Sequence, residues 1–214
     1  MESSILVTPY YCEDEMGYKC KWIYKQLKKA GKTNWGHRLY DKDHPAIPEN
    51  SIAALRNGLK YQIFDQFRYW EFDVVESSDG ILFVFHDATK KKTVRRLCPT
   101  APYNLIDRSL YDIASFNIKQ LRLMETNETI PTLAEIFSEF SRREIIKPIH
   151  IEIKKLMTTK AKKDIVLMAN SFRNETGYTV KFMMFRSKFN RVFKDDKDWF
   201  LGLLKMYNFE LIWI

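Results

Sequence analysis

The chain has 214 residues, of which 45% are hydrophobic and 14% aromatic, and its net charge at pH 7 is +8. This composition supports a buried core, excludes extensive disorder and suits a single domain. The three cysteines form no pattern typical of a disulfide framework or a zinc site. The positive charge favours an anionic partner, although it is equally compatible with solubility and no specific target.

Residues 1–34 are expected to form an N-terminal extension that contains a basic amphipathic helix. Between positions 16 and 30, Ile23, Leu27 and Ala30 share one helical face, and lysines cover the rest. Such a helix either packs on the domain or contacts anionic lipid headgroups. Neither a secretory leader nor ~18 consecutive apolar residues are visible, so we expect a cytoplasmic protein with at most peripheral membrane contact.

Segments with strand and helix patterns alternate from residue 35 onwards. A short strand is expected at 35–39, and a helix capped by Asn50 or Ser51 follows as far as Tyr61. Two further strands, 69–76 and 81–85, are separated by a turn signal that is too short for a parallel crossover. The sequence therefore predicts an antiparallel hairpin here.

The remaining chain continues the alternation after an irregular region at 90–128, which contains one short helix near 109–116. The later expected elements are a helix at 132–143, a strand at 148–154, a helix at 159–174, a strand at 181–186, a helix around Phe189 and Val192, an undecided segment at 199–204 and a buried strand at 209–214. This order predicts an α/β fold with a parallel sheet.

Three carboxylates on the predicted strands are candidate metal ligands. Glu71 and Asp73 lie two positions apart on a strand, so they face the same side and repel each other unless a cation is present. Glu152 lies among isoleucines on another strand, and three such oxygens suit one Mg²⁺ or Ca²⁺ ion. The alternative for Glu152 is an ion pair with Lys154 or Arg38.

Two histidines lie at the ends of predicted strands and are candidates for proton transfer. His37 closes the first strand, and His86 follows the hairpin, where it falls roughly opposite Glu71 and Asp73. Imidazole titrates near neutral pH, so such a pair is suited to general acid and base catalysis.

Basic side chains beside these histidines are candidate phosphate ligands. Arg38 offers a planar fork that matches phosphate oxygens, and Lys154 offers a point charge. Glu49 and Asn50 either support this site or cap the helix that follows them.

Taken together, these motifs resemble the glycerophosphodiester phosphodiesterase family, a branch of the phosphatidylinositol-phospholipase-C-like phosphodiesterases. The family pattern runs His-Arg-Gly, Pro-Glu-Asn-Thr, Glu-x-Asp-Val, Asp-Gly and His-Asp. The matching segments are His37-Arg38-Leu39, Pro48-Glu49-Asn50-Ser51, Glu71-Phe72-Asp73-Val74, Asp79-Gly80 and His86-Asp87, followed by Ile130-Pro131-Thr132-Leu133 and Ile151-Glu152-Ile153-Lys154. The resemblance covers about residues 35–155. Leu39 replaces the family's glycine, so we expect a reshaped pocket.

The resemblance implies a TIM-barrel-like (β/α) barrel with its site at the C-terminal ends of the strands. Such barrels usually need ~250 residues, and the family's closing strand motif is absent. We therefore expect a barrel domain at 35–214 that is incomplete or atypically closed at its C-terminus. The resemblance also implies a divalent metal on the three carboxylates and proton transfer by the two histidines.

The function expected from this resemblance is metal-dependent hydrolysis of glycerophosphodiesters or related lysophospholipids by general acid and base catalysis. Two alternatives remain open, an enzyme like sphingomyelinase D or lysophospholipase D, and a barrel that binds phospholipid headgroups without turnover. The substrate is a small molecule in each case. No motif for reading nucleic acid is visible, so no nucleic-acid partner is expected.

Overall fold

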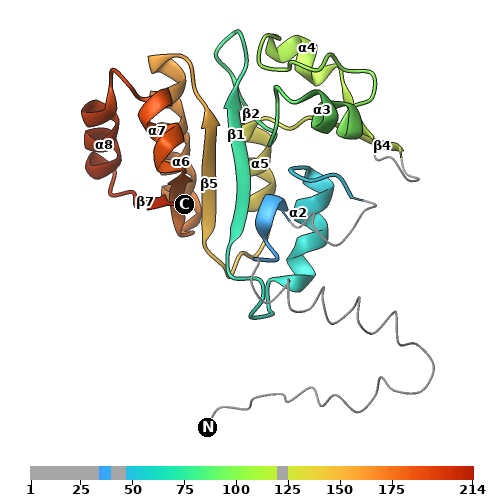
Figure 1. Ribbon diagram of the computed structural model, residues 1–214. Helices are drawn as coiled ribbons and strands as arrows, with labels where there is room; N and C mark the ends of the chain where they lie inside the picture. Colours follow the sequence, from blue (N-terminus) through green and yellow to red (C-terminus); the bar gives the residue numbers. More distant parts are fainter. Residues whose placement is uncertain (1–33, 40–46, 120–124) are drawn as a thin grey trace, which may run out of the picture.

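The computed structural model describes residues 34–39, 47–119 and 125–214 (Figure 1). The expected helix at 16–30 and all of the expected N-terminal extension except Asn34 lie outside these residues. Among the described helices, none is long and apolar enough to cross a membrane.

A five-stranded sheet forms the centre of the fold, with the strand order β2-β1-β5-β6-β7. Strands β1, β5, β6 and β7 are parallel, and β2 pairs with β1 in the expected antiparallel hairpin. The strands span Trp70–Glu76 (β1), Leu82–Val84 (β2), Ile149–Lys155 (β5), Val180–Met184 (β6) and Leu211–Trp213 (β7). Over the described residues this sheet does not close on itself, which confirms the expected α/β fold with an incomplete barrel.

Helices alternate with these strands, and a small two-stranded sheet accompanies them. The helices span Ile52–Gly58 (α2, continued by the 3₁₀ turn η3, Leu59–Tyr61), Lys91–Leu97 (α3), Leu110–Ala114 (α4), Leu133–Ser141 (α5), Thr159–Thr176 (α6), Arg186–Val192 (α7) and Lys197–Met206 (α8). The second sheet pairs β3 (Asn117–Lys119) with β4 (Glu125–Thr129).

Alternation along the strands gives the main sheet two different faces. Phe72 and Val74 on β1, with Ile151 on β5, belong to the larger core cluster, which also contains the apolar faces of α5, α6, α7 and α8. The intervening Glu71 and Asp73 point to the other face, as the two-residue period requires. The helix side is therefore apolar, and the opposite side is left for charged groups.

The segment 35–39 is not the strand that its sequence pattern indicates. It forms a turn and a 3₁₀ helix, η2 (His37–Leu39), in which Arg38 and Leu39 have positive φ of 53° and 62°. Gly36 allows this path beside β1, because a Cβ there would lie 2.1 Å from the carbonyl oxygen of Tyr69. Leu39 occupies a left-handed conformation that favours glycine, and its complete burial offsets the strain.

Other elements also differ from the expectations. Residues 91–97 form the helix α3, where an irregular region was expected. The sequence did not predict this helix, because only Val94 and Leu97 are buried and two apolar positions give a weak periodic signal. The 199–204 segment is helical as part of α8. Strand β7 is half-exposed rather than buried, because it pairs with β6 at the edge of the described sheet.

A buried histidine on β5, two residues before Glu152, should make stability fall in acid. His150 stacks on Tyr69 with ring centroids 4.1 Å apart, and burial together with Lys181 lowers the pKa of His150 to about 4. Between pH 6.5 and 4 the unfolded chain binds this proton and the folded chain does not, so folding weakens as pH falls, by at most about 3 kcal/mol. Urea unfolding at pH 7.0 and 4.5 should show that the free energy of unfolding falls less in His150→Asn than in the wild type. An equal loss in the two proteins would exclude this role.

Candidate active site

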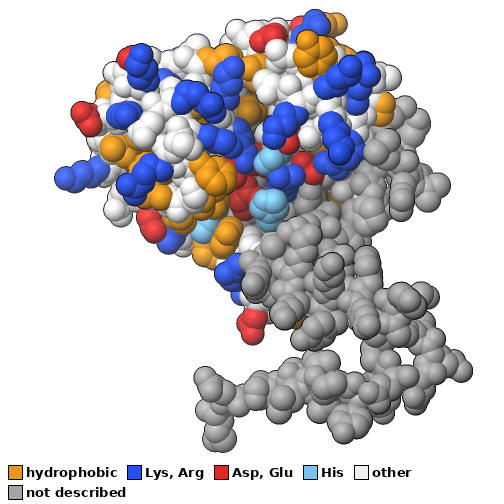
Figure 2. Space-filling view, viewed as in Figure 1, with side chains coloured by type: hydrophobic (Ala, Val, Ile, Leu, Met, Phe, Trp, Pro, Cys, Tyr) orange, Lys and Arg blue, Asp and Glu red, His pale blue; other side chains and the backbone are white. Residues whose placement is uncertain are grey.

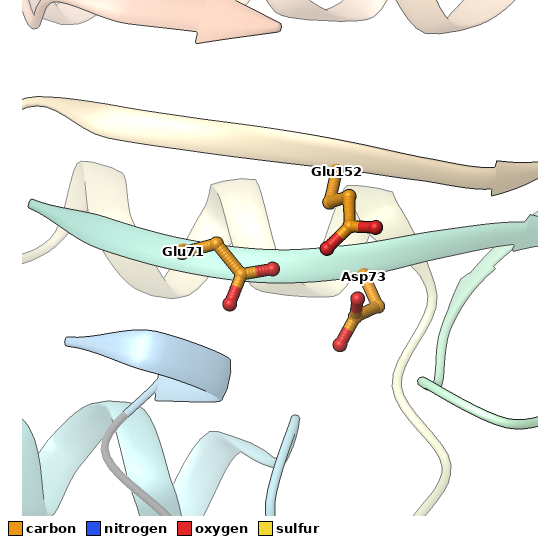
Figure 3. Close-up of side chains that lie close together, drawn as sticks. All are labelled: Glu71, Asp73 and Glu152. Carbon is orange, nitrogen blue, oxygen red and sulfur yellow. The ribbon is translucent and has the colours of Figure 1, made fainter. Parts of the chain in front are cut away.

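The three carboxylates predicted to bind a metal lie together on the polar face of the sheet (Figure 3). Glu71 and Asp73 come from β1, and Glu152 pairs in register with Asp73 from the neighbouring strand β5. One oxygen of each lies within 4.8 Å of the other two, and all three residues are buried. The parallel pairing of β1 with β5 therefore assembles residues that are about eighty positions apart in the chain.

The electrostatics of this cluster favour a bound cation. Burial and the neighbouring charge of Asp73 raise the pKa of Glu71 well above its usual value, and the same two causes raise the pKa of Glu152. Within the described part of the chain, the buried oxygen Oε1 of Glu71 has no hydrogen-bond partner. Buried carboxylate oxygens that repel each other and lack donors are suitable ligands for Mg²⁺ or Ca²⁺.

The positive charges of two lysines, Lys154 and Lys188, partly neutralise the negative charge of the carboxylates. Lys154 Nζ lies 2.9 Å from Asp73 Oδ1 and also contacts Glu152. Burial alone would lower the pKa of Lys154, but the charges of Asp73 and Glu152 outweigh burial and raise it. The ion pair between Glu152 and Lys154, considered above as an alternative to metal binding, is thus present beside the acidic cluster.

Lys188 also reaches this cluster, although the sequence analysis did not select it. Its Nζ lies 3.9 Å from Glu152 Oε1, and burial followed by the charge of Lys154 lowers the pKa of Lys188. The position of Lys188 just after β6 could have identified it from the sequence, since sites in parallel barrels form at the C-terminal ends of strands.

Both predicted histidines border the carboxylates, and Figure 2 shows histidine side chains beside acidic groups with lysines and arginines around them. His37 Nε2 lies 3.7 Å from Glu71 Oε2, and His86 Nδ1 lies 3.0 Å from Asp87 Oδ2. Burial lowers the pKa of His86. The charge of Asp73 acts to raise this pKa, and the charges of Lys154 and Arg38 lower it further. His86 is therefore neutral at pH 7 and can accept a proton.

Asn50 and Glu49 belong to the cluster and do not cap α2. The Nδ2 of Asn50 donates to Asp73 Oδ2 at 2.8 Å, and the backbone N–H of Asp73 donates back to Asn50 Oδ1 at 3.1 Å. Glu49 Oε1 accepts from Arg38 NH1 at 3.0 Å. The helix cap is Ser51, whose Oγ accepts from the backbone N–H of Ala54.

Arg38 connects several members of the cluster. Its backbone N–H donates to Glu71 Oε2 at 2.9 Å, and its Nε lies 3.8 Å from Asp73 Oδ2. The left-handed backbone at Arg38 allows both contacts from one residue. All nine residues selected from the sequence, His37, Arg38, Glu49, Asn50, Glu71, Asp73, His86, Glu152 and Lys154, thus lie in one connected neighbourhood.

The fold and this cluster define the chain as an α/β protein of the barrel class with an acidic site on the polar face of its parallel strands. The model of the glycerophosphoryl diester phosphodiesterase family matches residues 37–201. The chain belongs to this family, as its motifs indicated. No curated protein sequence matches it significantly.

Solved structures of this family have a similar fold. A glycerophosphodiester phosphodiesterase from Agrobacterium tumefaciens superimposes with a TM-score of 0.54 at 19% identity, over 77% of this chain and 60% of its own. A candidate glycerophosphodiester phosphodiesterase from Galdieria sulphuraria gives a TM-score of 0.52 at 19% identity, over 76% of this chain and 60% of its own. The chain thus spans about 60% of the length of either structure.

Proposed function

We propose that this chain hydrolyses glycerophosphodiesters or related lysophospholipids with the help of one divalent cation, Mg²⁺ or Ca²⁺. The supporting observation is the buried trio of Glu71, Asp73 and Glu152, whose oxygens lie within 4.8 Å of one another. These three residues would hold the ion, which would supply Lewis-acid stabilisation of negative charge on phosphate oxygen.

The two histidines carry the protons in this proposal. His86 accepts a proton from the attacking hydroxyl of the substrate or of water, and its lowered pKa keeps it neutral for this task at pH 7. His37 donates a proton to the leaving alcohol oxygen as the bond from phosphorus to that oxygen breaks. Asp87 Oδ2, 3.0 Å from Nδ1 of His86, orients the ring.

Three cations are assigned to the substrate phosphate. Arg38 and Lys154 are the ligands expected from the sequence, and Lys188 joins them because of its distance of 3.9 Å from Glu152. Once the carboxylates bind a divalent ion, these side chains are left with positive charge that the phosphodiester and its transition state can neutralise.

Substitution of Lys188 tests this assignment. Lys188→Met should lower kcat/KM by about tenfold or more, since a hydrogen bond to a charged group contributes about 1.5–3 kcal/mol. Lys188→Arg, which keeps the charge, should retain most of the activity, and calcium or magnesium affinity should change little in either variant. Unchanged kcat/KM in Lys188→Met would remove Lys188 from the site.

The proposed reaction is tested by turnover of glycerophosphocholine and lysophosphatidylcholine with Mg²⁺ or Ca²⁺ and again with EDTA. Choline released from glycerophosphocholine only when metal is present supports the proposal. Release from lysophosphatidylcholine alone would favour an enzyme like lysophospholipase D, and sphingomyelin serves as the corresponding substrate for sphingomyelinase D. Folded protein that binds these molecules without turnover would instead be a headgroup-binding barrel.

The wider setting of this activity is proposed from the sequence. Residues 35–214 would form the phosphodiesterase domain, in agreement with the family match at 37–201. The basic stretch within 1–34 would contact anionic membrane surfaces, and nucleic acid would not be a partner.

A further inference from the structure

Helix α3 carries an unusual concentration of positive charge directly after the His86-Asp87 segment. Positions 90–96 read Lys-Lys-Lys-Thr-Val-Arg-Arg, and four of the five cations are exposed while Arg96 is half-buried. In Figure 2 basic side chains surround the central group of histidines and carboxylates. The charge on α3 is therefore a local feature of the site's border.

Ion pairs hold α3 to the site at both of its ends. At the start, Lys90 Nζ lies 2.8 Å from Asp87 Oδ1. At the end, Arg96 NH2 lies 2.6 Å from Glu49 Oε2, while the other oxygen of Glu49 accepts from Arg38. Glu49 is only 5% exposed, so it bridges two guanidinium groups in a buried position. This bridge fixes the distance between α3 and the proposed phosphate ligand Arg38.

The remaining cations of α3 have no such structural role. Within the described ranges of the chain, Lys91, Lys92 and Arg95 form no ion pair with a carboxylate. Together with Arg96 they border a shallow, open surface hollow of about 560 Å³, which is lined mainly by the aliphatic stems of these four side chains. The charged ends of Lys91, Lys92 and Arg95 lie beyond these stems on one short helix, and several like charges on one exposed surface attract an anion.

The shape of α3 favours a compact anion over a membrane. A helix that lies in a bilayer interface needs an exposed apolar face opposite its basic face. The apolar residues of α3, Val94 and Leu97, are instead buried in the second core cluster, where they pack with Phe83 and Ile113. Its exposed side is entirely basic apart from aliphatic stems, and lysine and arginine in this arrangement are typical phosphate ligands.

We propose that α3 is a second anion subsite, which binds a phosphate monoester carried by the alcohol portion of the substrate. The preferred substrates would then be phosphodiesters whose headgroup bears an additional phosphate. This inference rests on the proposed function, in which Arg38 holds the scissile phosphate. The same phosphorylated headgroup occurs on soluble diesters and on membrane lipids, and the experiment below separates these sources.

The test compares glycerophosphoinositol with glycerophosphoinositol 4-phosphate, which differ by one phosphate. The variant is Lys92→Ala/Arg95→Ala, and both side chains are exposed, so folding should be preserved. The matched control is Lys163→Ala/Lys205→Ala, which removes the same charge from exposed positions on α6 and α8, beyond the other face of the sheet. We expect the wild type and the control to prefer the phosphorylated substrate by tenfold or more in kcat/KM. The variant should lose this preference while its kcat/KM for glycerophosphoinositol stays within twofold.

Three results would overturn the subsite: equal kcat/KM for the two substrates in the wild type, a preference that survives in the variant, or a preference that is lost equally in the control. If neither substrate is turned over, the proposed function fails, and calorimetric binding of the same two molecules decides the subsite separately. Tighter binding of glycerophosphoinositol 4-phosphate that depends on Lys92 and Arg95 supports the subsite, and equal binding excludes it.

Vesicle binding identifies the source of the headgroup. Sedimentation with vesicles that contain phosphatidylinositol 4-phosphate, compared with phosphatidylserine vesicles of equal charge, distinguishes recognition of the phosphorylated headgroup from adsorption to an anionic surface. Selective binding to the first, lost in the variant, indicates that the lipid form is accepted. Selective turnover of the soluble diester without vesicle binding supports the subsite with a soluble substrate. Equal binding to both vesicles, without preference among the soluble diesters, would replace the subsite with a general membrane contact.

Discussion

His86→Ala is expected to lower turnover of a glycerophosphodiester by about 10²–10⁴-fold, the usual contribution of general acid or base catalysis. Affinity for the divalent cation should be nearly unchanged, because the proposed ligands Glu71, Asp73 and Glu152 remain. His37→Ala should cause a loss of similar size. The measurement is the initial rate of alcohol release at saturating metal, with metal affinity followed separately by calorimetry.

The pH dependence distinguishes proton transfer from a structural role of His86. Burial lowers the pKa of His86 below its ordinary value of 6.5, so the neutral form predominates above pH 6.5. Protonation of this base should make kcat/KM decline at lower pH. This decline should be absent from the residual activity of His86→Ala. The control is His150→Asn, which changes a histidine on the same sheet face that stacks on Tyr69, two residues before Glu152. It should retain kcat, because His150 carries no proton in the proposed reaction. Full activity in His86→Ala, or an equal loss in the control, would contradict the assigned role.

Glu71→Gln is expected to abolish metal-dependent stabilisation while making the metal-free protein more stable. Glu71 is 1% exposed, and burial and Asp73 raise its pKa well above the usual value. The carboxyl of Glu71 has a pKa of about 4.5 in the unfolded chain and a higher pKa in the folded chain. As pH rises above about 4.5, the unfolded chain releases this proton more readily, so the contribution of Glu71 to metal-free stability declines. A neutral amide of the same shape removes this repulsion. At pH 8 in EDTA the Tm should rise by about 2–4 °C for each kcal/mol gained.

Calcium or magnesium should raise the Tm of the wild type and have little effect on Glu71→Gln. Turnover should fall by at least about 10²-fold, as for loss of a group that stabilises transition-state charge. Glu139→Gln is the matched control, because Glu139 is also buried but binds Arg56 and Arg143, which lower its pKa to about 2. This control should be less stable than the wild type and should keep the metal response. A Glu71→Gln protein that is destabilised in EDTA yet still stabilised by metal would exclude the three-carboxylate site.

The sequence predicted those parts of the molecule that depend on short-range patterns. Glu71 and Asp73 share a face because strand side chains alternate, and the hairpin follows from the short turn between two strand patterns. Helix α5 lies within the expected segment 132–143, and Thr132 caps it by forming a capping box with Glu135. The ordered motifs indicated the family, and the family match agrees.

Tertiary structure decided the features that depend on residues distant in the chain. The backbone at Arg38 and Leu39 is left-handed because Gly36 approaches β1 at Tyr69, which no local strand pattern reveals. Lys188 reaches Glu152 only because β6 lies beside β5 and α7 begins at its end.

Helix α3 is a similar case, since its seven residues have too few apolar positions to predict a helix. Burial of Val94 and Leu97 and the ion pair of Arg96 with Glu49 hold it in place. Local patterns determine which residues share a face, because steric preferences act over a few residues. Only packing between distant segments brings those faces together, and here it joins the acidic cluster to the histidines and to the basic helix beside them.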